Sequence, residues 1–69
     1  MSPEKMVMMA NQIATFFHSQ PGDPAPKVAE HLHDFWEPRM RIQLHAYIEA
    51  GGANLDPVVV EAARLLQAA

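Results

Sequence analysis

Cysteine is absent from this 69-residue sequence, and basic residues are scarce. Without cysteine the chain has no disulfide and no thiolate, so a domain this small must depend on its apolar core or on a partner. Five Lys and Arg against eight Asp and Glu give a formal net charge of −3, which argues against nucleic-acid binding. No apolar run approaches the roughly 20 residues that span a bilayer, and no signal-peptide pattern opens the sequence. We therefore expect a cytoplasmic protein that binds neither membranes nor nucleic acids.

Proline and glycine divide the chain into helical segments. A capping Ser or Asp directly before a proline is typical of a helix start, and it occurs at Ser2-Pro3 and Asp56-Pro57. The second helix begins at Pro24 or Pro26, with Asp23 or Ala25 as its cap, and Asp23 is the better capping residue. Pro38 ends one helix and begins the next, while Gly51 suits the left-handed residue that closes a helix. The sequence thus predicts an all-α fold, one domain over 1–69, as a compact bundle of about four short helices at 3–18, 25–36, 38–50 and 57–67.

Each predicted helix carries apolar residues at helical spacing. The stripe of the first helix contains Met6, Met9, Ala10, Ile13, Phe16 and Phe17. That of the second contains Val28, Leu32, Phe35 and Trp36, and we expect both stripes to be buried in the core. The last helix is apolar over so wide an arc that it must be central or covered by another chain. From these patterns we predict structural roles for Phe16, Phe17, Phe35, Pro38, Tyr47 and Gly51.

The stretch from residue 35 to 41 concentrates unusual residues: the only tryptophan, a proline and two of the five cations. Trp and Arg are enriched at interface hot spots, and an arginine beside an aromatic ring suits a desolvated contact. We therefore predict that Trp36, Arg39 and Arg41, with Glu37 among them, bind a partner. The alternative is that Trp36 is a core anchor and that the arginines are charges at the rim of the fold. The two arginines are about 200° apart around a helix, so they flank the apolar stripe and do not form one basic patch.

No combination of residues predicts catalysis or metal binding. His31 and His33 are two positions apart and point about 200° away from each other on a helix, so they cannot ligate one ion together. Glu30 and Asp34 share a helix face, but that face lies opposite the apolar stripe and is expected to be solvated. We expect no catalytic residue and no metal site.

Two segments resemble a known family. They are Met9–Phe17 (MANQIATFF) and Phe35–Arg41 (FWEPRMR), followed by the Ala50-Gly51-Gly52 helix end and the Leu55-Asp56-Pro57 helix start. Together they are similar to the delta subunit of cytoplasmic NAD-dependent, molybdenum-containing formate dehydrogenases. The resemblance extends from about residue 5 to residue 66, and only the loop at 20–26 departs from it.

The resemblance implies a small accessory subunit without a redox centre of its own. It would support assembly, molybdenum-cofactor insertion or stability of the large catalytic subunit. That subunit would hold bis-molybdopterin guanine dinucleotide and iron–sulfur clusters, and other subunits would hold FMN and NAD. Within this family the two arginines would touch either the large subunit or an anionic cofactor. If the chain does not belong to this family, it could be a self-associating helical module, which would form a homodimer when isolated, or a free-standing regulator.

Overall fold

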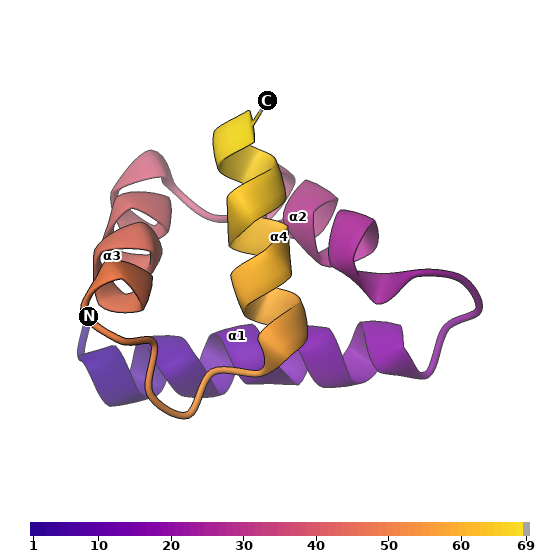
Figure 1. Ribbon diagram of the computed structural model, residues 1–69, viewed down its shortest axis with the longest axis horizontal. Coiled ribbons are helices and arrows are strands. Elements are labelled where there is room, and N and C mark those ends of the chain that lie inside the picture. The colour runs from indigo at the N-terminus through magenta and orange to yellow at the C-terminus, as the bar shows by residue number, and fades with distance from the viewer. Residues whose placement is uncertain (69) are drawn as a thin grey trace.

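The computed structural model describes residues 1–68, which form four helices: α1 Pro3–His18, α2 Pro24–Phe35, α3 Pro38–Glu49 and α4 Pro57–Ala68 (Figure 1). The described residues contain no strand. The predicted all-α fold is confirmed, and each predicted helix end lies within one residue of the observed end.

The helices α1, α2 and α4 begin at capping residues that the sequence predicts. The side chains of Ser2, Asp23 and Asp56 accept hydrogen bonds from backbone amides of the first helical turn at 3.2, 3.2 and 2.8 Å. In each case a proline comes next, where its missing N–H costs nothing. Pro38 likewise starts α3, although the side chain of Glu37 makes no capping hydrogen bond there.

The loop between α3 and α4 contains three residues in the left-handed region: Gly51 (φ 126°), Gly52 (φ 61°) and Asn54 (φ 67°). The amide of Gly52 donates to the carbonyl of Tyr47 at 3.0 Å, which closes the last turn of α3. The phenol of Tyr47 donates to the carbonyl of Ala53 at 2.8 Å. One aromatic side chain therefore joins the end of α3 to the loop that follows.

α4 is the central helix. It crosses in front of α1 and α2 in Figure 1, while α3 stands to one side, and the contact between α2 and α4 is the most extensive of any helix pair. The core gathers Met6, Ala10, Ala14, Val28, Ala29, Leu32, Trp36, Leu44, Val59, Ala62 and Ala63. The wide apolar arc of α4 is thus largely covered by the chain's own helices.

Two aromatic residues that the sequence placed in the core lie on the surface. Phe16 is 59% exposed and Phe35 is 74% exposed, so the prediction that they are buried is wrong. In α2 the buried arc is centred on Ala25, Ala29 and Leu32, which leaves Phe35 at its edge and at the last turn of the helix. Phe17 is half-buried against the core.

A side-chain bridge ties α1 to the start of α4. The amide nitrogen of Asn11 donates to the carbonyl of Asn54 at 2.8 Å, and its oxygen accepts from the amide of Asp56 at 2.9 Å. The carboxylate of Asp56 also lies 3.3 Å from the imidazole of His18. These contacts fix the loop, and with it the point where α4 begins.

Replacing Asn11 with Ala should therefore destabilise the fold. Two hydrogen bonds are lost, at about 1 kcal/mol each, so the free energy of unfolding should fall by about 1–2 kcal/mol. Urea denaturation followed by the fluorescence of Trp36 measures the change. The neighbouring exposed Gln12→Ala is the control, and equal effects of the two substitutions would contradict the bridge.

Candidate functional site

The residues that join α2 to α3 differ in how far they are buried. Trp36 caps α2 in an extended conformation, and the residue is only 5% exposed. Glu37 and Arg39 are exposed, while Arg41 is half-buried. The four predicted partner-binding residues therefore do not form one surface patch, and their role in binding stays a prediction.

Arg41 closes the C-terminal end of α2. Its Nη1 donates to the carbonyl of Trp36 and lies 3.2 Å from the carbonyl of His33 and 3.5 Å from that of Leu32. The carbonyls of His33 and Trp36 lie at the helix end, where intrahelical partners run out, whereas that of Leu32 also accepts the amide of Trp36 at 3.0 Å. A cation there also complements the helix dipole. The guanidinium thus has a structural role within the chain that sequence reasoning did not assign.

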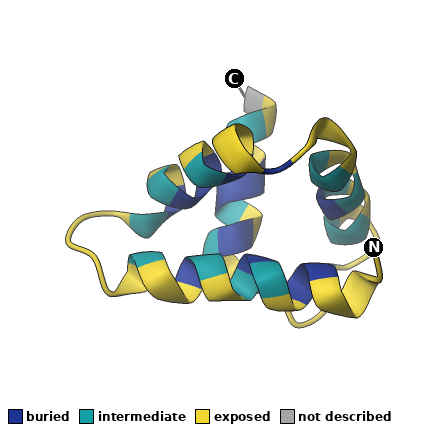
Figure 2. Cartoon of the chain, turned by 180° about the vertical axis from the view of Figure 1, so that it is seen from behind, coloured by how far each residue is buried: buried dark blue, intermediate teal, exposed yellow. Residues whose placement is uncertain are grey.

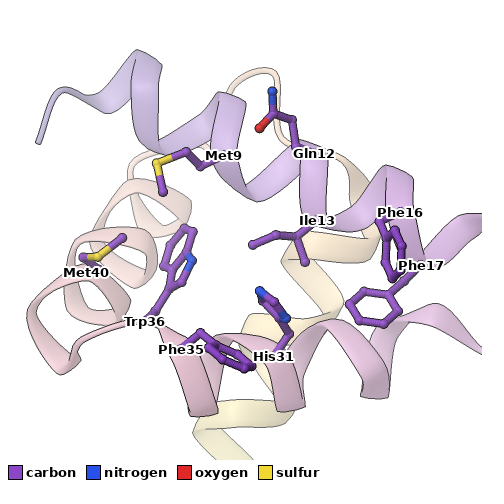
Figure 3. Close-up of a pocket in the computed structure, with 9 residues that line it drawn as sticks. All are labelled: Met9, Gln12, Ile13, Phe16, Phe17, His31, Phe35, Trp36 and Met40. Carbon is purple, nitrogen blue, oxygen red and sulfur yellow. The ribbon is translucent and has the colours of Figure 1, made fainter.

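An open apolar groove of about 570 Å³ lies between α1 and α2 and reaches the start of α3 (Figure 3). It is lined by Met9, Gln12, Ile13, Phe16, Phe17, His31, Phe35, Trp36 and Met40. α4 passes behind these side chains in Figure 3 and behind the α1–α2 pair in Figure 2, so the groove opens on the face away from α4.

Aromatic rings line one end of the groove. Phe16 and Phe17 meet edge to face with centroids 5.0 Å apart, and Phe17 meets His31 at 6.0 Å. His31 in turn lies 4.8 Å from Phe35 at an interplanar angle of 32°. The series crosses from α1 to α2, and its two outer members, Phe16 and Phe35, are the strongly exposed ones.

The groove exists because the core uses only part of the apolar arc of each helix. In α1 the buried residues are Met6, Val7, Ala10 and Ala14. At about 100° per residue, this arc is centred about 70° from the predicted stripe. The remaining apolar edge, which carries Met9, Ile13 and Phe16, faces the groove. Contiguous exposed apolar surface of this kind is typical of an interaction site.

Carboxylates flank the groove on the α2 side. A second hollow of about 440 Å³ adjoins the first, shares its aromatic residues and is also lined by Lys27, Glu30 and Asp34. The ammonium of Lys27 donates to the carbonyl of Pro21, and Asp34 shares a hydrogen bond with His33 at 3.2 Å. On the α1 side the polar lining residues are the neutral Gln12 and Gln20.

The described residues also bear on the predicted absence of metal and membrane binding. No three His, Asp or Glu side chains gather within residues 1–68 at a spacing that would hold a metal ion. Within the same residues, every helix is too short or too polar to cross a bilayer. On the exposed face of α4, the hydrogen bond and negative charge of Glu61 raise the pKa of Arg64.

The sequence was compared with protein families, curated proteins and solved structures. The model of the NADH-dependent formate dehydrogenase delta subunit family, FdsD, matches residues 5–63. The chain belongs to this family. Neither the curated proteins nor the solved structures gave a significant match. The family match confirms the resemblance seen in the sequence and connects the chain with a formate dehydrogenase complex.

In this delta-subunit chain, sequence reasoning missed the most prominent surface feature. It identified the apolar edges of α1 and α2, but assigned Phe16 and Phe35 to the interior and considered His31 only as a metal ligand. One signal was available: more apolar surface than a single small bundle needs. Which edge would remain uncovered depends on how each helix rotates against α4, and helical periodicity does not specify that rotation.

The capping role of Arg41 predicts that the two arginines of the delta subunit differ. Arg41→Met should lower the free energy of unfolding by about 1–2 kcal/mol, because carbonyls at the end of α2 lose a charged donor. Arg39→Met removes an exposed charge and should change the free energy of unfolding by less than about 0.5 kcal/mol. Urea denaturation of both variants measures this, and equal losses would contradict the capping role.

Proposed function

We propose that the chain is a non-catalytic accessory subunit of a cytoplasmic NAD-dependent formate dehydrogenase, bound to the large catalytic subunit. The family match over residues 5–63 is the observation that carries this proposal. The exposed apolar groove between α1 and α2 supports a role in binding another protein. The accessory subunit supports assembly, molybdenum-cofactor insertion or stability of the catalytic subunit.

The cofactors of the reaction belong, in this proposal, to the partner subunits. Bis-molybdopterin guanine dinucleotide and iron–sulfur clusters lie in the large subunit, and FMN and NAD lie in others. The donor set of this chain supports that division, because it has no cysteine and no gathered metal ligands among residues 1–68. The groove likewise has apolar walls and a carboxylate rim, which suit neither a phosphate nor a pterin nucleotide.

Arg39 and Arg41 are unequal candidates for contact with an anionic cofactor during insertion. Arg41 already donates to carbonyls of α2, so holding a phosphate would cost the cap of that helix. Arg39 is exposed, and its guanidinium makes no hydrogen bond or ion pair with another of residues 1–68. Arg39 can therefore contact the large subunit or an anionic cofactor without loss of a helix cap, whereas Arg41 cannot.

Producing the formate dehydrogenase complex with and without this chain tests the proposal. Without it, we expect less assembled complex or less molybdenum per large subunit. The rate of formate-dependent NAD reduction per molybdenum atom should stay the same, because an accessory subunit takes no part in the chemical step. Metal analysis, size-exclusion chromatography and steady-state kinetics give the three values.

Two results would overturn the proposal. One is a rate per molybdenum atom that falls while assembly and metal content are unchanged, since the chain would then contribute to catalysis. The other is failure of the tagged chain to co-purify with the large subunit at any salt concentration.

A further inference from the structure

We propose that the groove between α1 and α2 binds an amphipathic helix of the large catalytic subunit. Apolar side chains of that helix fill the groove, and Lys or Arg residues on its flank face the carboxylates of α2. This inference rests on the proposed function, because it takes the catalytic subunit as the partner. Beyond the proposed function, it specifies which surface of this chain binds the catalytic subunit and what kind of segment that surface binds.

The apolar part of the inference comes from side chains that the fold leaves in water. Phe35 is 74% exposed and Phe16 is 59% exposed, and both stand at the aromatic end of the groove. Burying an aromatic side chain removes a large apolar area from water, so two such rings are natural anchor contacts. Ile13, Trp36 and Met40 extend the same apolar wall.

The helical form of the occupant follows from the shape of the site. The walls are two helices, α1 and α2, and the opposite face of the same pair is covered by α4 (Figures 1 and 2). A helix packs between two others by placing its ridges in their grooves, as amphipathic helices do in helical docking sites. Strand addition would need an exposed sheet edge, and residues 1–68 contain no strand.

The basic flank follows from the charges around the groove. Glu30 and Asp34 are one helical turn apart on α2, both are exposed, and both line the hollow that continues the groove. Lys27, the cation of that hollow, is held at the carbonyl of Pro21, and Asp34 is hydrogen-bonded to His33, but the two carboxylates still outnumber the one lysine. A partner with Lys or Arg along this edge therefore gains electrostatic attraction, which raises its association rate and fixes its orientation.

The same charges select the catalytic subunit over a second copy of this chain. In a symmetric dimer each partner presents the same patch. Two copies that met through the groove would therefore bring the Glu30 and Asp34 edges of both chains to one interface, in a protein whose net charge is already −3. Like charges at an interface oppose association.

Variants of the full chain in the reconstituted complex test the groove. Phe16→Asp and Phe35→Asp place a charge where an apolar contact is expected, and each should weaken binding to the large subunit by about 30-fold or more, the size of a hot-spot loss. Ile42→Asp and Met8→Asp are matched controls. Both controls replace exposed apolar residues, at 68% and 52% exposure, that do not line the groove.

Circular dichroism measures the helix content of each variant and so shows whether it still folds. Because all four substituted side chains are exposed, we expect the helices to remain intact. If the wild-type chain binds the large subunit and the groove variants bind as tightly as the two controls, the inference is wrong and the proposed function stands. If the wild-type chain does not bind, the proposed function itself fails.

A second measurement tests the charged edge. The double variant Glu30→Gln with Asp34→Gln should weaken binding several-fold at low salt and flatten its salt dependence. Glu4→Gln with Glu49→Gln removes the same charge from exposed positions outside the groove and should leave both unchanged. Equal salt dependence in the two double variants would remove the basic flank from the inference.

A photo-crosslinking residue at position 35 identifies the occupant directly. We expect crosslinks to a helical segment of the large subunit that carries Lys or Arg beside its apolar face. Crosslinks to a second copy of this chain, or to a segment of the large subunit without basic residues, would overturn the inference.

Discussion

Small side chains where α2 and α4 pack together determine the rest of the structure. Ala29 of α2 and Ala62 and Ala63 of α4 are buried in the shared core, and this helix pair has the most extensive contact in the chain. Small residues let two helix axes approach closely. Because α2 turns its alanine side toward α4, its other apolar edge, with His31 and Phe35, faces away. The groove is thus a consequence of the way in which the core is packed.

A chain of 69 residues has little apolar area to spare. A domain of about this size buries only about 60% of the surface of its unfolded chain, so its stability is modest. Leaving Phe16 and Phe35 in water gives up stabilisation that a better covered core would have had. That arrangement is reasonable for a subunit of a larger complex, where the partner completes the burial that the isolated chain lacks.

The helices could be predicted from the sequence because their ends depend on local chemistry. A capping side chain followed by proline marks a helix start whatever the tertiary structure, and Asp23 and Asp56 do what the sequence indicates. The faces of the helices could not be predicted as well. Phe35 and Trp36 are adjacent, and the sequence assigned both to the buried side. Since α2 ends at Phe35, the extended backbone at Trp36 directs the indole into the core and leaves the phenyl ring outside.

The tertiary hydrogen bonds of polar side chains could not be predicted from the sequence, for a different reason. Asn11 lies on the polar side of α1, and only the fold brings the backbone of residues 54 and 56 within its reach, 43 and 45 positions away. Arg41 was expected to be at a partner surface because of its residue type, yet its nearest acceptors are carbonyls of its own chain. Residue type predicts that an arginine will find acceptors, but it does not predict to which chain they belong.

The segment from Phe35 to Arg41 thus connects the groove with the core. Trp36 is buried and also lines the groove, while Arg41 holds the end of the helix that carries Phe35. A helix bound in the groove would stabilise this segment, and a ligand that binds only the folded state stabilises it by about 2.7 kcal/mol at one hundred times its Kd. For a domain of modest stability, that gain is large. This chain and its partner would then stabilise each other, because linkage between binding and folding acts in both directions.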